Sequence, residues 1–172
     1  MANKQALRDL QSRLAERLQA AQTEARGKSW LAIESGARGF LFPLEEAGEI
    51  FPVAPLALVP HSHRWFLGVS NLRGHLHGVV DLAGFLGLKA IAGNRDQARL
   101  VGFNQALDIN CVLMVDRLSG LRSAEELEAQ SDDGTPRPKF AGGRYRDASA
   151  RIWQELNLSA LAAEEAFLGI VS

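Results

Sequence analysis

The sequence predicts a mainly β fold of the small barrel or sandwich type, and three observations support this prediction. Apolar residues alternate with small or polar ones in short runs, which is the period of a strand with one buried face. Glycine and other turn residues separate these runs, as in compact barrels and sandwiches. The 172 residues, of which 47% are hydrophobic and 23% charged, suffice for one domain with a sizeable core and are too few for two ordinary domains.

The chain begins with a predicted amphipathic helix. Residues 3–26 contain neither proline nor glycine, and Gly27 is expected to end the helix. Leucines recur at spacings of three and four at positions Leu7, Leu10, Leu14 and Leu18. Two interpretations of this leucine stripe stay open: it packs on the domain that follows, or it docks on a partner or a second copy, because an isolated helix is marginally stable with its stripe uncovered.

Short strands are expected after this helix. Residues 30–34 and 39–42 flank a turn and form a plausible hairpin. A helical turn is expected over residues 44–48, just after a proline. Residues 50–54 and 56–59 are short extended pieces, and the prolines among and beside them restrict these pieces to strand ends, sheet edges or bulges.

Residues 66–88 predict a complete unit of strand, turn, strand and short helix. The first strand covers residues 66–72, and the turn at residues 73–74 contains a glycine that accepts positive φ. The second strand covers residues 76–80, and Asp81 stands at the N-cap position of a short helix. Gly87 is expected to close that helix.

The second half of the chain predicts another β set. The polar residues 90–97 indicate a loop and a possible boundary between two β subdomains, and residues 129–139 indicate a mobile loop because they combine prolines, a glycine and adjacent acids. Asn157 or Ser159 is expected to cap a last helix that runs through Phe167. Further strands are expected at residues 98–103, 109–115, 140–144 and 150–156.

Composition and motifs argue against most enzyme classes and against nucleic-acid binding. The chain lacks a G-x-S-x-G elbow, a Walker A loop and a G-x-G-x-x-G fingerprint, so we expect no catalytic residues and no cofactor. The net charge of −1 gives no reason to expect nucleic acid as a partner, and no apolar run approaches the roughly 20 residues that span a bilayer. Cys111 lies in an apolar strand and is expected to be a packed thiol. A lone cysteine and an N-terminus without an apolar segment predict a cytoplasmic location.

The histidines carry the alternative hypothesis of a metal-dependent β-barrel enzyme. His61 and His63 form one H-x-H pair and His75 and His77 form another, and such a pair on a strand directs both rings to one face. His75, His77 and Asp81 resemble the first metal-binding motif of the cupins. Cupins need a further histidine well downstream, and none follows His77. We therefore predict surface or edge-strand histidines and no metal site.

The central unit also resembles a known family. GVSNLRG at residues 68–74, followed by VVDLAGFLGL at residues 79–88, is similar to the core signature of the CheW-like chemotaxis coupling domain. The resemblance covers roughly residues 29–168. It implies two intertwined five-stranded SH3-like barrels that share one core, with an N-terminal helical extension at residues 1–27. The resulting expectation is a CheW-like domain at residues 28–172, with a first barrel at about 28–88, a second at about 96–156 and a C-terminal helix at 157–168.

The resemblance also implies a pair of partner-binding residues. In the coupling family, a glutamate and the arginine of the NLRG motif are associated with partner binding, and Glu49 and Arg73 stand at the same separation of 24 residues. A guanidinium can grip a carboxylate bidentately and present its remaining donors outward. The pair is therefore either a partner-binding element or an internal brace.

Other residues of the motif are further candidates for partner binding by resemblance. Gly68 and Val69 lie on the strand that in the family lines a receptor-contacting groove, and Asn71 and Leu72 belong to the same motif. A side chain at Gly68 would block close backbone approach, although a bulge or a tight barrel corner explains a glycine there equally well. Ala47 occupies the position of another residue that the family uses near this groove.

The end of the chain narrows the resemblance to one subgroup. Residues 151–161 (RIWQELNLSAL), with Phe167 and Leu168, resemble the tail of the CheW-like proteins of the type IV pilus chemosensory system, the PilI type. The implied function is a non-catalytic adaptor in the control of twitching motility. Its implied partners are the regulatory domain of a chemotaxis-type histidine kinase and the cytoplasmic tip of a methyl-accepting chemoreceptor, with no nucleic acid and no direct membrane insertion.

Overall fold

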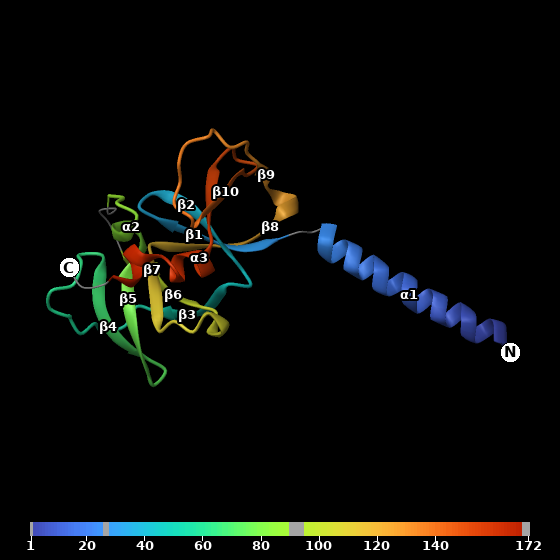
Figure 1. Ribbon diagram of the computed structural model, residues 1–172, viewed down its shortest axis with the longest axis horizontal. Coiled ribbons are helices and arrows are strands. Elements are labelled where there is room, and N and C mark those ends of the chain that lie inside the picture. The colour runs from blue at the N-terminus through green and yellow to red at the C-terminus, as the bar shows by residue number, and fades with distance from the viewer. Residues whose placement is uncertain (1, 26–27, 90–94, 170–172) are drawn as a thin grey trace.

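The computed structural model describes residues 2–25, 28–89 and 95–169, with the side chains of residues 3–16 in the first helix (Figure 1). The α-helices are α1 (Ala2–Ala25), α2 (Leu82–Phe85), α3 (Leu158–Ala162) and α4 (Glu165–Leu168), and short 3-10 turns cover Gln105–Leu107 and Ala124–Glu126. The strands are β1 (Ser29–Ser35), β2 (Arg38–Pro43), β3 (Ala47–Pro52), β4 (Phe66–Leu72), β5 (His75–Asp81), β6 (Arg99–Phe103), β7 (Cys111–Val115), β8 (Arg117–Ser123), β9 (Glu128–Ala129), β10 (Ala141–Arg146) and β11 (Ile152–Leu156).

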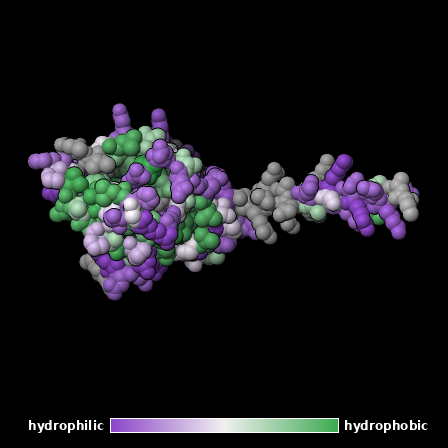
Figure 2. Space-filling model, turned by 90° about the horizontal axis from the view of Figure 1, so that it is seen from below, coloured by the Kyte–Doolittle hydropathy of each residue, from purple (hydrophilic) through white to green (hydrophobic). Residues whose placement is uncertain are grey.

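The N-terminal helix projects away from the β body. Figure 1 shows α1 at one end of the molecule, and Figure 2 shows its surface to be largely hydrophilic. Leu7, Leu10 and Leu14 are 56%, 55% and 50% exposed. The predicted helix is confirmed, and packing of its leucine stripe on the following domain is not observed for these three side chains. The side chain of Leu18 and the helix end at Gly27 lie outside the described residues.

The strands form two sheets, and the strands of one sheet lie between those of the other along the chain. One sheet, called sheet A here, has the order β8-β1-β2-β11-β10-β9, and the other, sheet B, has the order β3-β6-β7-β5-β4. The β2–β11 and β5–β7 pairs are parallel and the other neighbours are antiparallel. The mainly β fold with two sheets confirms the predicted fold class. Sheet membership does not follow the expected division into residues 28–88 and 96–156. Sheet A contains β1 and β2 together with β8 to β11, whereas sheet B contains the strands between them in the sequence, β3 to β7.

Each sheet encloses its own apolar cluster, and a third cluster lies between the sheets. Strand β1 is buried on both faces because Trp30 and Ala32 face the interior of sheet A, while Leu31 and Ile33 belong to the shared core. Every strand of sheet B contributes one buried residue to its interior, namely Phe51, Leu72, Val79, Leu100 and Val112. The shared core adds residues from β2, β4 to β7, β11 and α2 to α4. Removal of this much apolar surface from water is the main force that holds the two sheets together.

Several local predictions need correction. Strand β8, which pairs with β1, was not predicted. The helical turn expected at residues 44–48 is instead a turn at residues 44–46, and β3 begins directly after it. Asp81 stands at the N-cap position of α2, but its side chain makes no capping hydrogen bond, and burial raises the pKa of its carboxyl group. The expected last helix is divided into α3 and α4, and sheet A has six strands where five were expected.

The two predicted loops differ in how much of them is described. Residues 130–138 form a loop without regular secondary structure. The Asp132–Arg137 ion pair lies within this loop, and the Asp133–Arg144 ion pair ties it to β10. Most of the loop predicted at residues 90–97 lies outside the described residues. None of the described helices combines the length and the apolar character that a membrane span requires.

Candidate functional site

The structure brings Glu49 and Arg73 together from the two edges of sheet B. Glu49 lies on β3, which is one edge strand, and Arg73 lies in the turn after β4, which is the other. Their side chains form an ion pair, and the Arg73 guanidinium also lies 5.9 Å from the centroid of the Phe51 ring. The Arg73 side chain remains 73% exposed and that of Glu49 42% exposed. An ion pair this exposed adds only about 0–1 kcal/mol to stability. The exposed Arg73 guanidinium can still donate hydrogen bonds to a partner.

The turn that carries Arg73 is built by its neighbours in the NLRG motif. Arg73 and Gly74 have φ of 51° and 81°, which is the geometry of a two-residue hairpin turn that matches the twist of the strands. The Asn71 side-chain oxygen accepts a hydrogen bond from the Gly74 N–H at 3.0 Å. Leu72 is buried in the interior of sheet B. Asn71 and Leu72 therefore hold the turn in place, and Leu72 offers no side-chain surface to a partner.

Gly68 permits a close approach within the chain itself. Its φ is 137°, and a Cβ atom there would lie 2.4 Å from the Ala57 carbonyl oxygen. Ala57 and Val69 exchange two backbone hydrogen bonds of 2.8 and 2.9 Å, and the β4–β5 register shifts between Phe66 and Gly68. The bulge interpretation of Gly68 is confirmed, and the backbone that approaches it belongs to residues 53–59.

Residues 53–59 cover β4 and create an exposed apolar surface beside the ion pair. The Ser70 hydroxyl donates to the Pro55 carbonyl at 2.9 Å, which fixes this segment along β4 together with the Ala57–Val69 bridge. Val69 and Ala47 are half-buried against the shared core. Exposed apolar side chains of this region are Ile50, Val53, Leu56, Leu58, Val59 and Leu76, which we call the β4 patch. Exposed apolar groups of this kind, next to charges, are typical of protein-binding surfaces.

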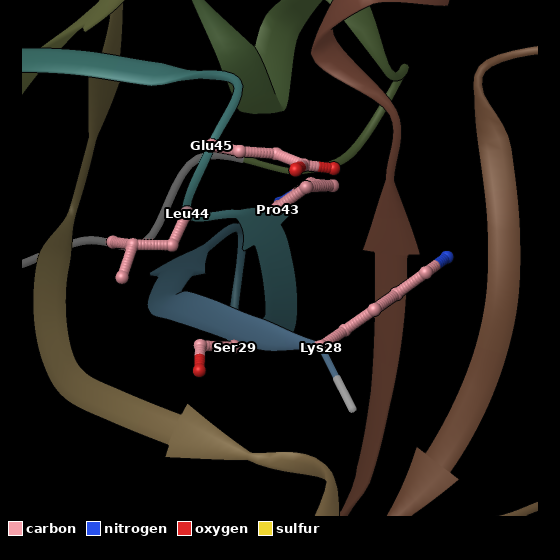
Figure 3. A pocket seen from close by; sticks show the side chains of 5 residues that line it. All are labelled: Lys28, Ser29, Pro43, Leu44 and Glu45. Carbon is pink, nitrogen blue, oxygen red and sulfur yellow. The ribbon is translucent and has the colours of Figure 1, made fainter. Parts of the chain in front are cut away.

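A second hollow lies near the opposite end of β2 from Arg38. It has a volume of about 420 Å³ and is lined by Lys28, Ser29, Pro43, Leu44 and Glu45 (Figure 3). Figure 3 shows Leu44 and Ser29 pointing to one side and Lys28 and Glu45 to the other. The Leu44 N–H donates to the Ser29 carbonyl at 2.9 Å, and Leu44 remains 43% exposed.

This hollow, which we call the Leu44 pocket, sits where sheet A passes into sheet B. Leu44 is hydrogen-bonded to the first residue of β1, Ser29, on one side of this strand. Leu121 on β8 pairs with Leu31 on the other side of β1 and is 60% exposed, so it is a second exposed leucine beside β1. The Lys28 ammonium lies 3.9 Å from the carboxylate of buried Glu155. Sequence reasoning missed this pocket; the signal that was available is the apolar Leu44 directly after Pro43, between a strand end and two glutamates.

The four histidines are exposed or half-buried, and Cys111 is buried. Among the described side chains, no group of three or more His, Cys, Asp or Glu residues is arranged to hold a metal ion. The His63 ring stacks on Trp65 with centroids 5.1 Å apart, and the Nδ1 atom of His77 lies 3.1 Å from the His75 carbonyl oxygen. Cys111 is buried, and burial raises the pKa of its thiol to about 12, which keeps it protonated and unreactive at neutral pH.

Comparison with known proteins gives three findings. The family model of the CheW-like domain matches residues 29–166. "Protein PilI" of Pseudomonas aeruginosa (strain PAO1) is 29% identical over 163 residues, which cover 92% of this chain and 88% of that protein. The crystal structure of the scaffolding protein TtCheW from Thermoanaerobacter tengcongensis superimposes with a TM-score of 0.61 at 15% identity, covering 76% of this chain and 84% of that one. The last likeness concerns the fold alone, and it agrees with the two-sheet architecture described above.

Proposed function

The chain belongs to the CheW-like domain family, and from this premise we propose that it is a non-catalytic adaptor that couples a methyl-accepting chemoreceptor to a CheA-type histidine kinase. We further propose that the pathway controls twitching motility through type IV pili, an assignment supported by the similarity to PilI. One observation carries the proposal: a single body presents two separate exposed surfaces, the β4 patch with its ion pair and the Leu44 pocket. An adaptor needs two such surfaces in order to hold two partners at once.

The resemblance implied a receptor-contacting groove along β4, but residues 53–59 cover this strand. We therefore propose the β4 patch as the docking surface for the regulatory domain of the kinase. The β4 patch offers six exposed apolar side chains, and Ile50 follows Glu49 directly on β3, so apolar burial can supply affinity while the charges of the Glu49–Arg73 pair fix orientation. The two-residue turn places the Arg73 backbone, and the contacts with the Glu49 carboxylate and the Phe51 ring position its guanidinium before any partner arrives. Glu49 and Arg73 thus act both as a brace between the sheet edges and as a recognition element.

The Leu44 pocket is the proposed docking surface for the helical tip of the receptor. Leu44 and Leu121 are exposed apolar groups on either side of β1, and an amphipathic helix buries such groups when it lies in a groove. Lys28 and Glu45 offer charges of both signs at the rim. We place the adaptor in the cytoplasm, where an unpaired thiol such as Cys111 stays reduced.

Two single variants test whether the surfaces are separate. Leu58 is 84% exposed in the β4 patch, so Leu58→Glu should weaken binding of the purified kinase regulatory domain at least tenfold and leave binding of a receptor tip fragment unchanged. Leu44→Glu should do the reverse. Isothermal titration calorimetry measures both affinities. Loss of both partners in each folded variant, or of neither, contradicts the assignment of two surfaces.

A charge-reversal cycle tests the ion pair. Arg73→Ala should weaken kinase binding, and Arg73→Glu more so, because a new carboxylate then faces Glu49 and the partner. The double variant Glu49→Arg with Arg73→Glu restores the internal pair with its polarity inverted. Stability should recover in the double variant while kinase binding stays weak. Full kinase binding by folded Arg73→Ala would remove Arg73 from the interface and leave the pair as a brace only.

A further inference from the structure

A third and larger hollow opens between the two sheets near α2. Its volume is about 650 Å³. One wall belongs to sheet A, where Phe40, Gln154 and Arg144 are cross-strand neighbours on β2, β11 and β10. Phe40 belongs to the shared core, whereas Trp153, the next residue before Gln154, faces the interior of sheet A. This row therefore faces sheet B across the hollow.

The opposite wall is aromatic. Trp65 and Phe85 line the hollow, and their rings meet edge to face with centroids 5.1 Å apart. His63 lines it as well and stacks on the Trp65 ring at 5.1 Å, and the buried Phe167 ring lies parallel to the same ring at 6.4 Å. A volume of this size with mostly apolar walls and a few polar groups is typical of a site for a small organic molecule, for which about 300–1,000 Å³ is usual. Flat aromatic groups pack well against such rings.

The charged groups that line the hollow are mainly arginines. They are Arg38, Arg137 and Arg144, and the lining contains one acid, Glu164. Arg137 pairs with Asp132 at 2.9 Å, Arg144 approaches Asp133 only to 3.4 Å, and Arg38 has no ion-pair partner among the described residues. Arg38 and Arg144 also line an adjoining hollow of about 500 Å³, so both guanidiniums stand between two cavities. Such guanidiniums bind carboxylate and phosphate oxygens with two hydrogen bonds each.

We propose that this hollow binds a small molecule that combines a flat aromatic body with an anionic group. The body lies against Trp65 and Phe85, and the anionic group lies between Arg38 and Arg144. The site is separate from the β4 patch and the Leu44 pocket, because its sheet A wall uses the Arg38–Phe40 end of β2 whereas the Leu44 pocket uses the Pro43 end. Its existence therefore does not depend on the proposed partners.

Two probes of nearly the same shape test the proposal on the full-length protein. The probe 1-anilinonaphthalene-8-sulfonate carries an anionic group, and N-phenyl-1-naphthylamine has the same aromatic body without the charge. Fluorescence titration should show one saturable sulfonate site per chain. The double variant Arg38→Ala with Arg144→Ala should weaken sulfonate binding at least tenfold and change binding of the neutral probe less than twofold. Arg8→Ala, a surface arginine on the distant helix α1, is the matched control and should change neither.

A second variant tests the place of the site. Ala166 is exposed on α4 and lines the hollow, so Ala166→Trp should block both probes without disturbing buried side chains. Competition with 1-naphthyl phosphate and 1-naphthoate then distinguishes a phosphate ligand from a carboxylate ligand. The proposal is overturned if the wild-type protein shows no saturable binding of the sulfonate, if the arginine variants lose both probes equally, or if folded Ala166→Trp binds both probes as the wild type does.

Discussion

Replacement of Gly68 by alanine should destabilise the protein far more than a change of one methyl group suggests. The new Cβ atom would lie 2.4 Å from the Ala57 carbonyl oxygen and 3.0 Å from its carbonyl carbon, both of which are backbone atoms. Residues 53–59 would have to move away from β4. The two hydrogen bonds between Ala57 and Val69 would then break.

The expected loss of unfolding free energy is about 3–5 kcal/mol. Two backbone hydrogen bonds contribute about 1 kcal/mol each. An L-residue at φ of 137° adds about 1–3 kcal/mol of backbone strain, because only glycine adopts this region readily. A loss of this size is a large part of the 5–15 kcal/mol that is typical of a folded domain.

Gly74→Ala is the matched control for this variant. Gly74 also has positive φ, at 81°, but no atom lies within 4 Å of its added Cβ, so only about 1 kcal/mol of backbone strain is expected. Urea unfolding, followed by the fluorescence of the three tryptophans, measures both variants. Equal destabilisation by the two substitutions would refute the close-approach argument for Gly68 and would leave partner contact as the remaining role for this glycine.

Three further predictions concern buried polar groups. Burial alone would raise the pKa of Glu34, but ion pairs with Arg151 and Arg117 lower it. Glu34→Gln should therefore reduce the free energy of unfolding by about 1 kcal/mol at neutral pH. In urea titrations this difference between variant and wild type should disappear as the pH falls through the lowered pKa. Cys111 has its thiol pKa raised to about 12, so Ellman's reagent should modify it only after unfolding, and modification of the native protein would place it outside the core. The Trp30 indole donates to the Glu155 carboxylate at 2.5 Å, so Glu155→Leu should lose about 1–3 kcal/mol and Glu155→Gln clearly less in thermal unfolding.

Local sequence signals predicted what short segments do on their own. The hairpin turn at Arg73 and Gly74 depends on positive φ at adjacent positions, and an arginine followed by a glycine within an alternating pattern indicates such a turn. The contact between Glu49 and Arg73 was expected through the resemblance, because strand periodicity alone does not bring two edges of a sheet together. The structure shows the pair in contact; its role toward a partner stays a prediction.

Features that depend on distant partners escaped prediction. Strand β8 carries only two leucines among polar and small residues, and it is a strand because β1 offers it a free edge. The Glu46 carboxylate accepts hydrogen bonds from the Leu158 N–H at 3.1 Å and from the Ser159 hydroxyl, across 112 and 113 residues of sequence, and no local pattern indicates these contacts. At Asp81 a local signal predicted a contact that is absent. Aspartate is a preferred N-cap residue and Asp81 stands at the N-cap position of α2, but its side chain makes no capping hydrogen bond.

The passage from sheet A to sheet B connects the two proposed docking surfaces through a very short stretch of chain. Leu44 lines one pocket, Glu46 holds the N-terminus of α3, and Glu49 pairs with Arg73 beside the β4 patch, all within six residues. Two barrels joined end to end by a linker would let each partner bind without any effect on the other surface. If a helix docks at the Leu44 pocket as proposed and displaces Leu44, we expect an effect on the hydrogen bonds of Glu46 and on the start of β3, because packed strands move as units and deform little. The fold therefore suits an adaptor that passes on the state of one partner to the other, which a flexible tether between two binding modules would not do.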